Sequence, residues 1–214
     1  MAKFVVAVDG PAGSGKSSVS KAAAERLGLA YLDTGAGYRA FALHAMRAGA
    51  DPIEAAISSF DYEISLDPEG QFVRLSGSDV TDAIRSAEVA AKVSEFARMP
   101  QVRQLQLDDA RTRIATAKAE GIVVEGRDIT TVVAPDAQVR VLLTASEAVR
   151  LARRAKEMTE DTGNLVSRDA SDSKVVDFFN PAEGVTLLDT TELDFEQSVD
   201  ALVGLIREGG YVGR

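Results

Sequence analysis

The sequence predicts a three-layer α/β fold, in which helices cover both faces of a five-stranded parallel sheet and a small antiparallel β insert interrupts the chain. Two features support this prediction. Strand-like runs alternate with helical patterns twice in the first fifty residues, which is typical of parallel βαβ units. These runs are also short and apolar, as expected of strands that are buried on both faces.

Two strand–helix pairs begin the predicted fold. Residues 4–8 (FVVAV) and 30–32 (AYL) are the strand-like runs, and they are followed by Asp-Gly-Pro and Asp-Thr-Gly turn sequences. Apolar residues then recur at helical spacing over 17–27 and 38–48, and a glycine follows each helix as a stop signal. We therefore expect the order strand, helix, strand, helix.

A hairpin is predicted next, because residues 62–66 and 72–75 are strand-like runs on either side of an Asp-Pro-Glu-Gly sequence. Pro68 sets φ for a turn, and we expect Gly70 to supply a positive φ. We assign about 58–82 to a small insert. The core of the single domain then comprises residues 1–57, 83–157 and 173–214.

The rest of the chain returns to alternating helices and strands. The predicted elements are a helix from Pro100 to Gly121, strands over 122–124, 139–143 and 185–188, and helices capped by Ser146 and Asp194.

Composition restricts the function. The 214 residues include 24 Lys and Arg against 33 Asp and Glu, a formal net charge of −9, which argues against an extended surface for nucleic acid or anionic membranes. There is no cysteine, which excludes disulfides, cysteine zinc sites and thiol catalysis. Because His44 is the only histidine, we expect neither a histidine-rich metal site nor a histidine charge relay. No apolar run approaches the ~20 residues of a membrane span, and no signal-peptide core follows Met1. We expect a cytoplasmic, monomeric enzyme.

Residues 10–17 (GPAGSGKS) match the P-loop pattern G-x-x-x-x-G-K-[ST] between a predicted strand and a predicted helix. In that pattern, backbone N–H groups and the helix N-terminus bind phosphates. Lys16 can reach the β- and γ-phosphates, and the Ser17 hydroxyl can hold Mg²⁺. The alternative is a tight glycine turn with a capping serine. The predicted ATP-binding residues are Gly10, Pro11, Ala12, Gly13, Ser14, Gly15, Lys16, Ser17 and Ser18.

Arginines indicate a second anion site. Arg39 and Arg127 follow predicted strand ends, where ligands bind in parallel α/β sheets, so both are expected to face the crevice of the P-loop. Two guanidinium groups directed at one crevice are typical of a second phosphate site, because guanidinium donors can bind a phosphate in a bidentate manner. The alternative for each is an exposed ion pair, which we favour for Arg150 and Arg207 because they lie on predicted helices.

Further motifs follow the P-loop in a fixed order. They are Leu32-Asp33-Thr34-Gly35-Ala36, Tyr38-Arg39, Val124-Glu125-Gly126-Arg127-Asp128, Thr131-Val132-Val133, Pro135-Asp136-Ala137 and Asp189-Thr190. With the P-loop, they span nearly the whole chain and resemble the motifs of the bacterial cytidylate kinases, which are P-loop nucleoside monophosphate kinases. The resemblance implies ATP-dependent, Mg²⁺-assisted phosphorylation of CMP and dCMP to CDP and dCDP.

The resemblance also implies the acceptor site. The CMP-binding residues it implies are Thr34 and Asp128 at the cytosine edge, Arg103 at N3 and O2, Arg39 and Arg127 at the phosphate, and Ser94, Arg168 and Asp172 at the sugar. Arg168 would also lie near the transferred phosphoryl group, so the implied catalytic residues are Lys16, Arg127 and Arg168. Cytosine presents an amino donor at N4 and acceptors at N3 and O2, which suits these side chains. Ser94 as a plain helix serine and Thr34 as a turn residue are the alternatives.

The chain departs from the family pattern at several positions. The lid, about 158–172, is short, and Lys174 stands one place early where the family has Arg. Thr130 replaces a glycine, and Gly37 replaces a methionine before Tyr38. A shortened lid is expected to change turnover or ATP affinity.

The implied reaction needs no general base, because the attacking phosphate oxygen is already ionised, so we assign no acid–base role to Asp33 or Asp128. Two alternatives stay open. One is a related small-molecule kinase with another acceptor, and the other is a non-catalytic nucleotide-binding regulator.

Overall fold

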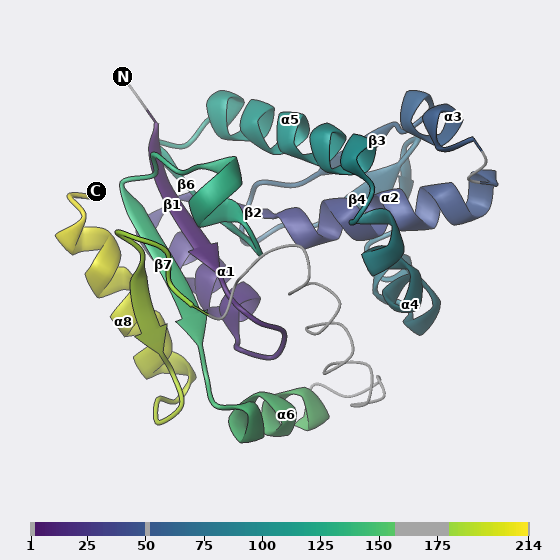
Figure 1. Cartoon of the computed structure of the whole chain (residues 1–214). Helices are drawn as coiled ribbons and strands as arrows, with labels where there is room; N and C mark the ends of the chain where they lie inside the picture. The colour runs from purple at the N-terminus through teal and green to yellow at the C-terminus, as the bar shows by residue number, and fades with distance from the viewer. Residues whose placement is uncertain (1–2, 50–51, 157–179, 214) are drawn as a thin grey trace.

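The computed structural model describes residues 3–49, 52–156 and 180–213, which form the predicted three layers (Figure 1). The main sheet contains β1 (Phe4–Asp9), β2 (Ala30–Asp33), β6 (Gly121–Gly126), β7 (Val139–Thr144) and β8 (Thr186–Asp189). Its spatial order is β2-β6-β1-β7-β8, and all four neighbouring pairs are parallel. The predicted five-stranded parallel sheet is confirmed, with β1 at its centre.

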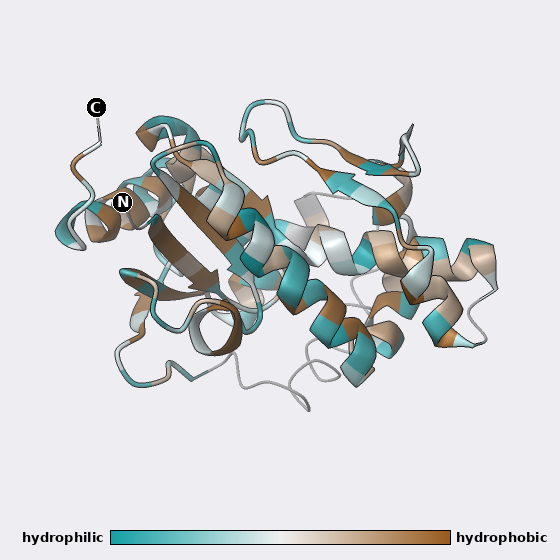
Figure 2. Ribbon diagram, turned by 90° about the horizontal axis from the view of Figure 1, so that it is seen from above, coloured by the Kyte–Doolittle hydropathy of each residue, from teal (hydrophilic) through white to brown (hydrophobic). Residues whose placement is uncertain are grey.

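Alternation along β1 creates two separate cores. Val5 and Ala7 point to one face of the sheet, and Val6 and Val8 point to the other. The first face is covered by α2 (Thr34–Ala48), α4 (Ala87–Phe96) and α5 (Pro100–Thr116), and the second by α1 (Lys16–Leu27) and α8 (Phe195–Glu208). The apolar strands lie between these helices in Figure 2. The helix α6 (Glu147–Lys156) follows β7.

The insert is antiparallel, as predicted, but it has three strands. These are β3 (Tyr62–Ile64), β4 (Val73–Leu75) and β5 (Ser78–Asp79), between α3 (Ile53–Ser58) and the short helix η1 (Ala83–Arg85). Ser76 and Gly77 join β4 to β5 with φ of 46° and 77°, as a type I′ hairpin turn requires. The prediction that Gly70 has a positive φ is wrong. The Asp67 carboxylate organises that loop instead, by accepting a hydrogen bond from the Glu69 amide at 3.0 Å.

Several element boundaries differ from the prediction. The helix α2 begins at Thr34 rather than at 38, because the Asp33 carboxylate caps it through the Ala36 amide at 3.0 Å. Gly121 does not end a helix: it begins β6, where a Cβ atom would lie 2.7 Å from the Phe4 carbonyl oxygen. A five-residue π-helix, η2 (Ile129–Val133), was not predicted. No helix among the described residues is long and apolar enough to cross a membrane.

All four tyrosines are expected to titrate above their ordinary range. Burial raises the pKa of Tyr31, Tyr38, Tyr62 and Tyr211, and for Tyr38 the value is about 12. A phenol with a raised pKa in the folded state stabilises the fold below pH 10, and this contribution is lost as the pH rises towards the folded pKa. The free energy of unfolding should therefore fall between pH 10 and 12, measured by urea denaturation. Phenolate absorbance of the folded protein with a midpoint at pH 10 would contradict this.

Candidate active site

The P-loop connects β1 to α1, as predicted. Gly13 and Gly15 have φ of 73° and 88°, a left-handed conformation that favours glycine. A Cβ atom at Gly10 would lie 2.1 Å from the Leu143 carbonyl oxygen, so this position also requires glycine. The helix α1 begins at Lys16, which places its N-terminus against the loop. This strand–loop–helix geometry suits a bound triphosphate.

Two arginines of α6 hold the outer side of the P-loop. The Arg150 guanidinium donates to the Ala12 carbonyl oxygen at 2.9 Å, and Arg153 donates to the Ser14 carbonyl oxygen at 2.9 Å. Arg153 also donates to the Thr190 carbonyl oxygen at 2.8 Å. The expectation that Arg150 forms an exposed ion pair is wrong, because only 8% of this residue is exposed. Helical spacing alone did not reveal that α6 lies against the loop.

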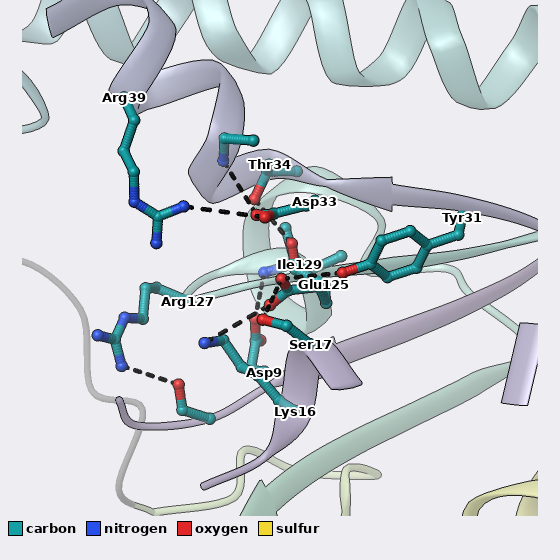
Figure 3. A network of polar contacts seen from close by, with 12 residues as sticks. Asp9, Lys16, Ser17, Tyr31, Asp33, Thr34, Arg39, Glu125, Arg127 and Ile129 are labelled. Atoms are coloured by element: carbon teal, nitrogen blue, oxygen red, sulfur yellow. Dashed lines mark hydrogen bonds and ion pairs between the residues drawn. The ribbon is translucent and has the colours of Figure 1, made fainter. Parts of the chain in front are cut away.

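Glu125 is a central residue that the sequence analysis did not select. Its carboxylate accepts a hydrogen bond from the Ser17 hydroxyl at 2.7 Å and lies 3.5 Å from the Lys16 ammonium group (Figure 3). It follows Ile122, Val123 and Val124 in a strand whose residues are all buried, and it is 2% exposed. An acidic residue at the end of such an apolar run was the available signal, since charged residues are rarely buried without partners.

Glu125 also contacts a second buried carboxyl group, that of Asp33. The two side chains are close enough for each to influence the pKa of the other. Burial raises the pKa of Glu125, and the neighbouring Asp33 adds to this effect. For Asp33, burial is outweighed by Arg39, Lys16 and the Ala36 amide, so its pKa lies below the usual range. The Arg39 guanidinium lies 3.8 Å from the Asp33 carboxylate.

Asp9 fixes the turn that carries Arg127 and Asp128. Its carboxylate accepts hydrogen bonds from the amides of Ile129 and Thr130 at 2.8 and 2.9 Å, and from the Thr130 hydroxyl at 2.6 Å. Burial raises the pKa of Asp9, and the bonds from Thr130 and Ile129 oppose that shift. Arg127 in turn donates to the Gly10 carbonyl oxygen at 2.8 Å. The end of β1 thus joins the P-loop to the turn after β6.

A cavity of about 340 Å³ adjoins this turn between α2 and α5. All three residues that the resemblance implies for cytosine binding line it, namely Thr34, Arg103 and Asp128. Arg103 donates to the Asp128 carboxylate at 2.5 Å, and the Thr34 hydroxyl donates to the Glu125 carbonyl oxygen at 2.8 Å. Burial, with Asp128 nearby, raises the pKa of Tyr38 in the cavity wall to about 12, so its phenol is neutral at physiological pH. The cavity wall therefore presents both hydrogen-bond donors and hydrogen-bond acceptors to a ligand.

The other implied acceptor-site residues fall into two groups. Ser94 lies on α4, outside the set of residues that line the cavity, and its sugar-binding role stays a prediction. Arg168, Asp172, Lys174 and the lid at 158–172 lie outside the described residues.

Comparisons with known proteins identify the family of this chain. A model of the family described as cytidylate kinase matches residues 6–208. The chain belongs to the cytidylate kinase family. Among curated members, the cytidylate kinase of Cutibacterium acnes is 46% identical, with 95% of this chain and 96% of that protein covered. That of Rhodococcus jostii is 43% identical, with 99% and 98% covered.

A solved structure supports the fold. A gluconokinase from Sinorhizobium meliloti has a TM-score of 0.52 at 16% identity, with 97% of this chain and 93% of that one covered. At this identity the likeness concerns the P-loop kinase fold alone. In the present member of the cytidylate kinase family, that fold brings Lys16, Ser17, Arg39 and Arg127 to one edge of the sheet (Figure 3).

Replacing Thr130 tests the Asp9 connection in this cytidylate kinase family member. Thr130→Val keeps the shape of the side chain but removes the hydroxyl donor to a buried carboxylate. Hydrogen bonds to charged groups contribute about 1.5–3 kcal/mol, so a loss of stability in this range is expected in urea denaturation. Thr130→Ser keeps the hydroxyl, so its free energy of unfolding should fall markedly less than that of Thr130→Val. Equal stability of the Val and Ser variants would contradict the role of the hydrogen bond.

Proposed function

We propose that this chain transfers the γ-phosphoryl group of ATP to CMP and dCMP, giving ADP with CDP or dCDP. One observation carries the proposal. The Arg39 Nη1 atom is buried and has no hydrogen-bond partner among the described residues, and the Asp33 oxygen 3.8 Å away is beyond hydrogen-bonding distance. A buried donor of this kind is costly without a partner, and a phosphate oxygen would satisfy it.

The position of Arg39 favours an acceptor phosphate over a second contact to ATP. Arg39 belongs to α2, whose first residue, Thr34, lines the cavity, while Arg127 contacts the first carbonyl of the P-loop. Their guanidinium groups extend to the same side of the polar network as Lys16 in Figure 3. A monophosphate between the two arginines would thus lie between the P-loop and the cavity, as in-line transfer requires.

The cavity suits cytosine as the acceptor base. Asp128 supplies carboxylate acceptors for the N4 amino group, and Arg103 supplies donors for N3 and O2. Uracil has the opposite pattern at N3 and C4, so it would leave buried polar groups unpaired. This complementarity supports CMP and dCMP over UMP.

On the donor side, we propose that Lys16 and Ser17 leave Glu125 for the nucleotide. Both contact the buried Glu125 carboxylate, at 3.5 and 2.7 Å. Lys16 would then bind the β- and γ-phosphates, and the Ser17 hydroxyl would hold Mg²⁺. When bound, Mg²⁺ supplies neutralisation of charge on the phosphates. Backbone N–H donors suit the phosphate oxygens of ATP, and the hydroxyl oxygen at the start of the helix is a suitable ligand for Mg²⁺ bound with those phosphates.

The proposed chemistry depends on positioning and charge rather than on a general base. The acceptor phosphate oxygen carries its own negative charge, and the carboxylates nearest to it already have partners. Asp33 caps α2 and faces Arg39, and Asp128 pairs with Arg103. The proposed catalytic residues are Lys16, Arg127 and Arg168, the last of which lies outside the described residues. The effect of the short lid, the monomeric state and the cytoplasmic location stay predictions.

An assay of ADP formation with a panel of acceptors tests the function. CMP and dCMP should support turnover far above that with UMP, AMP or shikimate. Turnover with another member of the panel instead would favour a related kinase with a different acceptor. ATP binding without acceptor-dependent ADP formation would favour a non-catalytic regulator.

Arg127→Ala separates acceptor binding from donor binding. The variant removes a guanidinium group that would neutralise the acceptor phosphate, so turnover of CMP should fall by at least about a hundredfold. The dissociation constant for ATP, measured by calorimetry, should change little. Arg207→Ala is the matched control, because Arg207 is exposed at the end of α8. Loss of ATP binding together with turnover would contradict the assignment of Arg127 to the acceptor.

A further inference from the structure

The acceptor cavity has two helical walls, each with a regular row of residues. On α5, Arg103, Gln106, Leu107 and Ala110 follow the i, i+3, i+4, i+7 spacing of one helix face, and all line the cavity. On α2, Thr34 and Tyr38 line it, and Gly37 shares their helix face. Gln106 therefore lies one turn beyond Arg103, on the same wall that faces the acceptor base.

Gln106 is held against Gly37. It is 5% exposed, and its Nε2 atom donates to the Gly37 carbonyl oxygen at 3.3 Å. A Cβ atom at Gly37 would lie 2.5 Å from the Gln106 Oε1 atom and 3.0 Å from the Tyr62 hydroxyl oxygen. Glycine inside a helix is less favourable than alanine by about 1 kcal/mol, so its presence has a packing reason here. It makes room for the carboxamide.

The hydrogen bond to Gly37 also fixes the direction of the amide. Because Nε2 serves as the donor to a backbone carbonyl, Oε1 is the end that can accept from a ligand. The N4 amino group of cytosine has two N–H donors, and Asp128 can accept only from those that its pairing with Arg103 leaves accessible. A second acceptor on the cavity wall would satisfy the remaining N–H.

We propose that Gln106 is a specificity-determining residue of the acceptor site, whose side-chain carbonyl oxygen accepts a hydrogen bond from the N4 amino group of cytosine. Uracil would place its O4 acceptor against that oxygen, so the same contact disfavours UMP. This inference rests on the proposed function, because it assigns a base contact within the same site.

The first test compares Gln106→Leu with Gln101→Leu. Both make the same chemical change on α5, but Gln101 is exposed and does not line the cavity. Gln106→Leu should lower kcat/KM for CMP, because it removes the hydrogen bond to N4, and raise kcat/KM for UMP, because it removes the repulsion of O4. The CMP-to-UMP selectivity should therefore fall by about tenfold. The change should appear in KM and in the calorimetric dissociation constants of CMP and UMP, with kcat nearly unchanged. Gln101→Leu should keep the selectivity of the wild type.

A second variant keeps the inference testable if Gln106→Leu fails to fold. Gly37→Ala adds a Cβ atom that displaces the Gln106 carboxamide while improving helix propensity. It should lower the selectivity severalfold, and this effect should vanish when it is added to Gln106→Ala. The inference would be overturned if folded Gln106→Leu kept the CMP-to-UMP selectivity of the wild type. It would also be overturned if Gly37→Ala lowered that selectivity equally in the wild type and in Gln106→Ala. Wild-type protein that does not phosphorylate CMP would instead overturn the proposed function.

Discussion

The Asp9 carboxylate, at the end of the central strand, connects the two halves of the site. It accepts three hydrogen bonds from Ile129 and Thr130, and the next residue along the chain is the first glycine of the P-loop. The segment held in this way begins just after Arg127 and Asp128. Because β1 and β6 are adjacent parallel strands, their carboxyl ends lie side by side, and a single buried carboxylate is enough to set one loop against the other. The residues proposed for the donor site and those proposed for the acceptor phosphate are therefore held by the same carboxylate.

Buried charge is organised around this support by pairing. Glu125 is surrounded by Lys16, Ser17, Tyr31 and Asp33, and Asp33 in turn faces Arg39. On the other side of the P-loop, Arg150 and Arg153 donate hydrogen bonds to the carbonyl oxygens of Ala12 and Ser14. A buried charge is costly without a partner. In the pairs formed by Lys16 with Glu125 and by Arg39 with Asp33, a phosphate group could take the place of the carboxylate. Pairing of this kind suits a site that must hold two highly charged nucleotides at the same time.

The sequence predicts the parts of this site that depend on local chemistry. The P-loop motif, the strand runs and the capping box at Asp194 each rest on a few neighbouring residues, and the structure confirms their placement. Features that depend on distant partners were missed. Arg150 and Glu125 gain their importance only through contacts with distant parts of the chain, and Gly121 is needed because Phe4 passes beside it. The turn at 67–70 was assigned to Gly70, although Asp67 was the available signal, since an aspartate commonly accepts a hydrogen bond from the amide two residues on.

Simultaneous occupation of the donor and acceptor sites is the central claim, and a bisubstrate ligand that joins adenosine to cytidine through a polyphosphate chain tests it most directly. Its dissociation constant can be compared by calorimetry with those of ATP and CMP. If the P-loop and the Arg39–Arg127 pair receive adjacent phosphates, the linked ligand should bind with a stoichiometry of one and at least about a hundredfold more tightly than either nucleotide. Once bound, the linked ligand should also prevent both ATP and CMP from binding. Affinity no greater than that of ATP, with CMP still able to bind, would contradict the account.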